Sequence, residues 1–144
     1  MFEDKEKEIV KEQQLLTLFE IGSGTGNTIF PLLKIFNEEK DYKNSKLFTY
    51  AWDLSSTAVD LINKEGNTYW EAFQKNFVMD LITEIKDNTL NFITMIFFLS
   101  AVHPDYFNQT LQKAKQLLAK DSTSYILFRD YGAYDLAMLR FLKK

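Results

Sequence analysis

One segment near the amino terminus carries most of the information about the fold, and it reads Leu15-Leu16-Thr17-Leu18-Phe19-Glu20-Ile21-Gly22-Ser23-Gly24-Thr25-Gly26. Its first part, Leu15 to Ile21, is a short apolar run typical of a strand that is buried on both faces. Glycines follow at alternate positions. A helical pattern then runs from Asn27 to Phe36, with Pro31 in the first turn, where a missing N–H does no harm. A strand, a glycine loop and a helix in this order favour an α/β fold with a ligand-binding loop.

Strand-like and helix-like runs alternate along the rest of the chain, which predicts helices packed on a parallel sheet. A charged helix is expected within Met1 to Glu12, before the first strand. Further strands are predicted at Leu47–Trp52, Ala72–Met79, Asn91–Leu99 and Ser124–Phe128, and further helices at Thr57–Lys64 and Asp105–Ala119. Because the carboxyl ends of parallel strands meet at one edge of the sheet, we expect ligands to bind there.

The composition is that of a globular protein. The chain has 144 residues, of which 46% are hydrophobic and 26% are charged, so residues 1–144 are expected to form a single domain. The longest apolar run falls short of the roughly 20 residues that cross a membrane. The first residues lack the apolar core of a secretory signal, so we expect a cytoplasmic protein. With no Cys and one His, the chain offers no disulfide framework, and no metal site is expected.

Two aspartates follow predicted strands and suit nucleotide recognition. Asp53 ends the second strand, where a carboxylate can accept hydrogen bonds from both hydroxyls of a ribose. Asp80 ends the predicted third strand and is placed to receive an adenine amino group. Either aspartate could instead cap a helix or lie in a solvated loop. Glu20 could bind only the loop backbone, and the glycines themselves could be purely structural.

The glycine loop resembles the first motif of the class I S-adenosylmethionine-dependent methyltransferases. Gly22, Gly24 and Gly26 stand at alternate positions, with Glu20 just before them. The dinucleotide fingerprint instead needs a third Gly or Ala where this chain has Asn27. A dinucleotide-dependent oxidoreductase therefore remains an alternative that Asn27 disfavours.

Four longer stretches make the resemblance more specific. In chain order they are Glu20–Leu33, Ala51–Val59, Phe97–Pro104 (Phe-Phe-Leu-Ser-Ala-Val-His-Pro) and Phe128–Asp135 (Phe-Arg-Asp-Tyr-Gly-Ala-Tyr-Asp). Together they resemble the methyltransferase-like family that makes 3-methylcytidine in the anticodon loop of tRNA. The resemblance implies a Rossmann-like α/β sheet with helices on both faces, S-adenosylmethionine as cofactor and tRNA as substrate. For some members it also implies help from a seryl-tRNA synthetase.

The resemblance and the chemistry of the side chains together predict the site. The residues expected to bind the cofactor are Glu20, Gly22, Gly24, Gly26, Asn27, Asp53, Leu54, Ser55, Asp80, Leu81 and Phe98. Asp130 is the expected catalytic carboxylate, because it can stabilise the positive charge of a methylated cytosine. Arg129 beside it could pair with a phosphate or form a structural salt bridge. His103 is expected near the substrate, with a hydrogen-bonded role at a helix start as the alternative.

The chain also departs from the family. Family members carry a basic and aromatic segment before the first strand and continue into further strands past the position of Lys144, so we expect a partial domain that lacks the last strands. The net charge is −3 and the densest basic run is Lys143-Lys144, which predicts weak binding to RNA. Two alternatives remain: a methyltransferase completed by further segments or a partner, and a non-catalytic binding subunit that keeps the fold.

Overall fold

The computed structural model describes residues 14–38, 42, 44–66 and 68–141. Its strands are β1 (Gln14–Ile21), β2 (Ser45–Asp53), β3 (Trp70–Gln74), β4 (Phe92–Ile96) and β5 (Tyr125–Arg129), and its α-helices are α1 (Ile29–Glu38), α2 (Ser56–Lys64), α3 (Phe107–Leu117) and α4 (Leu136–Phe141). All strand pairs are parallel, in the order β3-β2-β1-β4-β5. The expected α/β architecture is confirmed. The helix predicted within Met1 to Glu12 and the basic pair Lys143-Lys144 fall outside the described residues.

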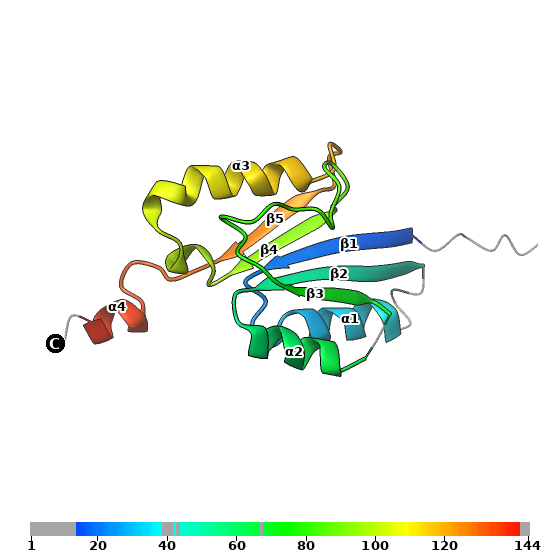
Figure 1. Cartoon of the computed structure of the whole chain (residues 1–144), viewed down its shortest axis with the longest axis horizontal. Coiled ribbons are helices and arrows are strands. Elements are labelled where there is room, and N and C mark those ends of the chain that lie inside the picture. Colours follow the sequence, from blue (N-terminus) through cyan, green and yellow to red (C-terminus); the bar gives the residue numbers. More distant parts are fainter. Residues whose placement is uncertain (1–13, 39–41, 43, 67, 142–144) are drawn as a thin grey trace, which may run out of the picture.

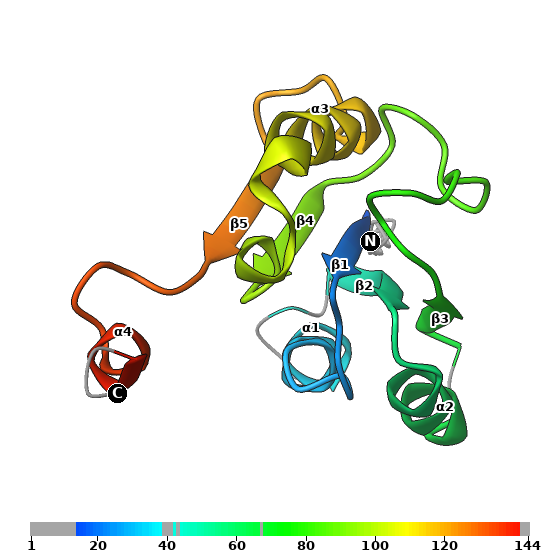
Figure 2. The same cartoon turned by 60° about the vertical axis from the view of Figure 1, so that its left-hand side comes forward.

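Helices cover both faces of the sheet. Figures 1 and 2 show α3 on one face, over β4 and β5, and α1 with α2 on the other face, beside β1, β2 and β3. The short helix α4 stands apart from this body, beyond β5 (Figure 2). As a result, the face of β5 opposite α3 has no helix against it within the described part of the chain.

The central strand β1 contributes to both halves of the core, because successive side chains of a strand point to opposite faces. Phe19 and Ile21 pack in the cluster that includes Ala114 of α3. Leu18, on the opposite face, packs with Ile29 of α1. The carboxyl half of β1 is therefore buried on both faces, as its apolar run predicted.

The third strand ends earlier than predicted. It stops at Gln74, and residues up to Met79 form a turn in which Oδ1 of Asn76 accepts hydrogen bonds from the backbone N–H groups of Val78 and Met79. Phe77 is buried at 3% exposure, although it lies in this turn rather than in the strand. The predicted end of this strand at Met79 was wrong, because a loop residue that packs in the core gives the same apolar signal in the sequence as a strand residue.

The fourth strand is also shorter than predicted. It ends at Ile96 instead of Leu99, because Phe97 adopts a left-handed conformation with φ of 55° and turns the chain away from the sheet. A 3-10 turn follows at Leu99–Ala101, and a second one at Pro104–Tyr106 leads into α3. The sequence analysis did not predict α4, whose six residues are too few to show a helical period.

Candidate functional site

The glycine loop lies where the strand order reverses. The chain adds β2 and β3 on one side of β1 and then crosses to add β4 and β5 on the other side, so the crevice for a ligand lies between the ends of β1 and β4. Gly22, Gly24 and Gly26 have φ angles of 75°, 53° and 88°, in the left-handed region that favours glycine. A Cβ atom at Gly24 would meet no atom within 4 Å, whereas one at Gly26 would lie 2.5 Å from the Phe30 ring. The loop is therefore open at Gly24 and packed at Gly26.

The end of β2 holds this loop in place. Oδ2 of Asp53 accepts a hydrogen bond from the backbone N–H of Gly24 at 2.8 Å, and Oδ1 accepts one from the N–H of Ser55 at 2.8 Å. The carbonyl of Trp52 accepts from the N–H groups of both Gly22 and Ser23. Ser55 is the N-cap of α2, and its Oγ accepts from the N–H of Ala58. Each carboxylate oxygen of Asp53 keeps a free lone pair for a ligand hydroxyl.

A cavity of about 420 Å³ opens beside the loop, at the carboxyl ends of the strands. This volume is within the range of small-molecule sites, about 300 to 1,000 Å³. Five of the predicted site residues line it, namely Gly22, Asp53, Leu54, Phe98 and His103. The remaining predicted residues lie outside its lining: Glu20, Gly24, Gly26, Asn27, Ser55, Asp80, Leu81, Arg129 and Asp130.

Asp80 does not end a strand, because β3 stops at Gln74. Its side chain is exposed, and its Oδ2 accepts a hydrogen bond from the N–H of Asn76 at 2.7 Å. Asn76, Phe77 and Met79 line the cavity in its place. These three residues were not predicted to lie at the site, although the polar pair Lys75-Asn76 after an apolar strand is a turn signal that could have located this loop.

Two lysines hold the loop that follows β3. Lys113 of α3 donates to the backbone carbonyls of Phe77 and Asp80. Lys75 pairs with Glu84 and also donates to the carbonyl of Leu81, whose own side chain is 81% exposed. The wall of the cavity formed by this loop is thus fixed from both sides.

Glu20 lies behind the loop in a buried position. It is 1% exposed, and its Oε2 has no hydrogen-bond partner within the described residues. Burial raises the pKa of Glu20 to about 7; a hydrogen bond from Thr28 lowers it, and the charge of Asp53 raises it further. A buried carboxylate is costly unless it is paired, so the free oxygen of Glu20 suits a cationic group of a ligand.

Asp130 lies directly after β5 and is held by the backbone. Its Oδ2 accepts from the N–H of Ser100 at 2.9 Å, and its Oδ1 accepts from the N–H of Tyr131 at 2.8 Å. Partial burial raises the pKa of Asp130, but the hydrogen bonds, led by those from Ser100, lower it below its ordinary value. The carboxylate is therefore ionised at neutral pH. It is hydrogen-bonded to Ser100, the residue that precedes the cavity-lining Ala101.

Arg129 lies over the ring of Phe97 and does not form the salt bridge with Asp130 that was one of its expected roles. Its guanidinium carbon lies 5.5 Å from the centre of the Phe97 ring. No ion pair joins Arg129 to Asp130 among the residues the structure describes. Arg129 is thus an exposed cation beside an aromatic ring.

His103 begins the 3-10 turn before α3. Its Nδ1 accepts a hydrogen bond from the N–H of Asp105 at 3.4 Å, which caps the turn, and the ring also lines the cavity. The same Nδ1 lies 3.5 Å from Oδ2 of Asp105. The structural role and the position near a ligand are therefore compatible.

The described residues contain neither a cluster of metal-ligating side chains nor a helix suited to crossing a membrane. No group of three or more His, Asp or Glu side chains there could hold a metal ion. None of the helices that the structure describes has the length and apolar character needed to cross a membrane.

Solved structures with the same arrangement identify the fold. A methyltransferase of Aquifex aeolicus, described as SAM dependent, aligns with a TM-score of 0.62 at 22% identity, over 86% of this chain and 61% of that one. Phosphoethanolamine N-methyltransferase 1 of Haemonchus contortus, solved in complex with S-adenosylhomocysteine, aligns with a TM-score of 0.67 at 11% identity, over 85% and 23%. The chain has the fold of the class I methyltransferases.

Curated relatives are more similar in sequence. The tRNA N(3)-cytidine methyltransferase METTL2 of Danio rerio is 40% identical over 131 residues, and METTL6 of Homo sapiens is 37% identical over 135 residues. O-methyltransferase 3 of Dictyostelium discoideum is 40% identical over 139 residues. The matches cover 88%, 90% and 92% of this chain but only 35%, 44% and 29% of the relatives. No protein-family model matches the chain.

Proposed function

We propose that this chain is the cofactor-binding part of a methyltransferase that transfers a methyl group from S-adenosylmethionine to N3 of a cytidine in tRNA. The observation that supports the proposal is the hydrogen bond from Gly24 to Asp53, because it puts a carboxylate that could accept from a ribose beside an open glycine loop and a cavity. The choice of a tRNA cytidine as methyl acceptor rests on the names of the relatives, which are tRNA N(3)-cytidine methyltransferases.

The residues of the chain fit this cofactor in three respects. Gly24 leaves space where a Cβ atom would stand, so a ligand can approach the loop backbone. Asp53 lines the cavity with two carboxylate oxygens that can accept from hydroxyls. Glu20 offers a buried carboxylate with a free oxygen close behind the loop, which suits the ammonium group of an amino acid.

The remaining predicted cofactor-binding residues stay predictions, and they differ in whether they line the cavity. Leu54 and Phe98 line the cavity, and Phe98 packs between Phe77 and the Gly22 position, so both can form an apolar wall for a base. Asp80 and Leu81 would reach a ligand only if their exposed side chains turned towards it. Asn27 is exposed in the loop before α1.

The cofactor, when bound, supplies an electrophilic methyl group on a sulfonium. N3 of an unpaired cytosine has its own lone pair, so the chain needs no general base and acts mainly by holding the reactants in line. Asp130 is ionised and oriented by Ser100 and Tyr131, so it can stabilise the charge that develops on the base and accept from the exocyclic amine. Arg129 stays available to pair with a phosphate.

A second candidate is transfer to a hydroxyl group, which the name of the Dictyostelium relative favours. That reaction requires a base to remove the hydroxyl proton. His103 is the one histidine of the chain and lines the cavity, and its Nδ1 lies near both the N–H and the carboxylate of Asp105. A histidine beside a carboxylate can serve as such a base, so the methylated product decides between the two candidates.

Calorimetry with S-adenosylhomocysteine and with NAD tests the cofactor, and mass spectrometry of nucleosides tests the acceptor. We expect S-adenosylhomocysteine to bind and NAD not to bind. Incubation with S-adenosylmethionine and unmodified tRNA should give 3-methylcytidine, slowly with the chain alone and faster when a seryl-tRNA synthetase is added. Binding of NAD alone would overturn the proposal in favour of an oxidoreductase. A product methylated on oxygen would favour the second candidate, and cofactor binding without any product under both conditions would favour a non-catalytic subunit.

A further inference from the structure

An exposed pair of aromatic rings lies at the carboxyl edge of the sheet. Phe97, after β4, is 43% exposed, and Tyr131, after β5, is 60% exposed. Their ring centres are 5.0 Å apart, with the planes tilted by 42°. Neighbouring large aromatic side chains that remain open to solvent on a folded surface commonly mark a binding site.

The backbone holds both rings in this position. Phe97 has a φ of 55°, a conformation that costs energy for a residue other than glycine, and its N–H donates to the carbonyl of Arg129 at 2.7 Å. The N–H of Tyr131 donates to Oδ1 of Asp130 at 2.8 Å. The pair is therefore a built feature that joins the ends of two strands.

A cation completes the cluster. The Arg129 guanidinium carbon lies 5.5 Å from the centre of the Phe97 ring, and the Arg129 side chain is exposed. Aromatic rings next to an arginine are typical of surfaces that stack an unpaired base and pair with the neighbouring phosphate. A protein interface would also accept aromatic rings, but it would not need the guanidinium to remain open to solvent beside them.

The cluster also borders the cavity of the candidate site. Phe97 contacts Tyr131 on the surface and lines the cavity. Asp130 lies between Arg129 and Tyr131 in the chain, with its carboxylate held by Ser100. A base stacked on Tyr131 would thus be next to the carboxylate proposed to stabilise it.

We propose that Tyr131, supported by Phe97 and Arg129, forms the stacking surface for an unpaired pyrimidine base of a single-stranded RNA segment. This inference rests on the proposed function, because it assigns the acceptor side of the same site. Tyr131, the residue varied in the test below, does not line the cavity proposed for the cofactor.

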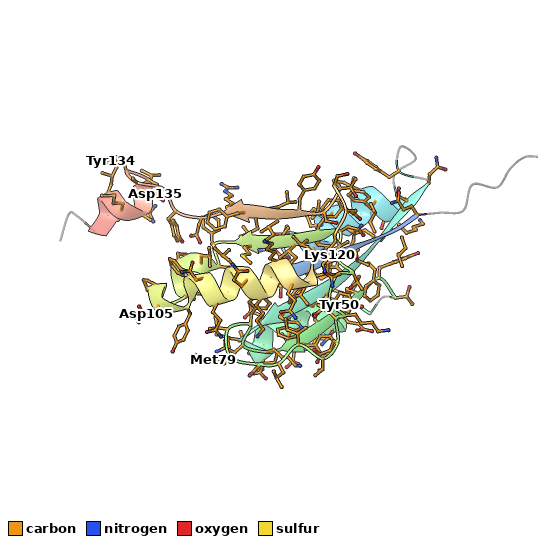
Figure 3. All side chains as sticks on the ribbon, turned by 90° about the horizontal axis from the view of Figure 1, so that it is seen from above. Tyr50, Met79, Asp105, Lys120, Tyr134 and Asp135 are labelled. Carbon is orange, nitrogen blue, oxygen red and sulfur yellow. The ribbon has the colours of Figure 1, made fainter. Side chains whose placement is uncertain are left out.

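Fluorescence anisotropy with two RNA probes tests the stacking surface on the full chain at low salt. One probe is a short RNA hairpin with a cytidine in its single-stranded loop, and the other is a fully paired duplex of the same length. Tyr131→Leu should weaken hairpin binding about tenfold or more, whereas Tyr131→Phe should retain it, since stacking needs only the ring. Tyr134→Leu is the matched control, because Tyr134 is 79% exposed and lies beside α4 at the end of the molecule (Figure 3).

The outcomes separate this inference from the proposed function. Equal hairpin binding by wild type and Tyr131→Leu, equal binding of hairpin and duplex, or no hairpin binding by the wild type would each overturn the stacking surface. Calorimetry with S-adenosylhomocysteine should give the same affinity for wild type and Tyr131→Leu, and its failure for both would overturn the proposed function instead. If sedimentation shows that Tyr131→Leu changes the oligomeric state and leaves RNA binding intact, the rings form a protein interface and the inference is wrong.

Discussion

The carboxylate of Asp53 accepts a hydrogen bond from the backbone of Gly24, with Oδ2 2.8 Å from the nitrogen. The end of β2 and the loop after β1 are thus joined by a charge-assisted bond at the mouth of the cavity. Together with the carbonyl of Trp52, which accepts from Gly22 and Ser23, this contact supports the loop and leaves other carboxylate lone pairs for a ligand.

Replacement of Asp53 should weaken the cofactor site. Asp53→Ala removes charge-assisted hydrogen bonds to the ribose and the support of Gly24, so we expect a loss of about 1.5 to 3 kcal/mol in the free energy of binding S-adenosylhomocysteine. Titration calorimetry measures it. Asp60→Ala, at an exposed position on α2, is the control and should bind normally. Equal affinities of wild type and Asp53→Ala would refute the assignment of Asp53.

Glu20 should make the stability of the fold depend on pH. Its pKa is raised from 4.5 to about 7, chiefly by burial, so the folded state holds this proton over a range in which the unfolded state has lost it. Stability from this group is fully present below about pH 4.5 and is lost as the pH rises to about 7, by roughly 3 kcal/mol at about 1.4 kcal/mol per pH unit.

The variant Glu20→Gln removes that ionisation without changing the shape of the side chain. Urea unfolding at several pH values should show a variant more stable than wild type at about pH 8 and similar to it at about pH 4.5. Glu65→Gln, at the exposed end of α2, is the control and should follow wild type. A constant difference between Glu20→Gln and wild type across this range would show that Glu20 does not titrate as expected.

The glycines of the loop should separate stability from binding. Gly26→Ala places a Cβ atom 2.5 Å from the Phe30 ring, which also packs on Trp70, and we expect a loss of about 1 to 3 kcal/mol in unfolding free energy. Gly24→Ala meets open space, so it should cost less stability but hinder the approach of a ligand. Denaturant unfolding and calorimetry on both variants measure the two effects. The reverse order of stabilities would mean that the loop repacks around Phe30.

The edge strand β5 should promote association between copies of the chain. It pairs with β4 alone in the described sheet, and its Tyr125 and Leu127 are 54% and 50% exposed on the face that no described helix covers. Unpaired apolar edges bind other strands. Leu127→Lys should therefore raise the monomer fraction in sedimentation velocity, whereas Leu61→Lys, on the exposed side of α2, should not. A wild-type chain that is monomeric with a sharp thermal transition would contradict this expectation.

The purified 144-residue chain should bind the cofactor but methylate tRNA slowly. Its net charge is −3, which leaves few cations to hold a polyanion, and it spans about a third of the METTL2 relative. A basic RNA-binding segment supplied by fusion, or a tRNA-binding protein supplied in trans, should raise the rate more than any substitution in the glycine loop. Quantification of 3-methylcytidine measures this, and rapid formation by the unaided chain would refute it.

Local patterns in the sequence predicted the fold class and the glycine loop with Asp53 at the end of the next strand. These are local features: the apolar run before Gly22, the alternate glycines and Asp53 after a strand. Local features can be predicted from the sequence because residues that are close in the chain are also close in space. Pro31 in a first helical turn was predicted for the same reason, and it is confirmed.

The ends of β3 and β4 and the grouping of Phe97, Arg129 and Tyr131 depend on contacts between distant parts of the chain. Phe77 is buried but lies in a turn, and Phe97 is exposed at the end of an apolar run, so hydrophobicity gave the wrong secondary structure for Phe77 and the wrong burial for Phe97. Asp80 lost its predicted place at a strand end because Asn76 turns the chain before it. The contact of Phe97 with Tyr131 and Arg129 joins the ends of two strands, and no local pattern can show it, because it depends on the pairing of β4 with β5.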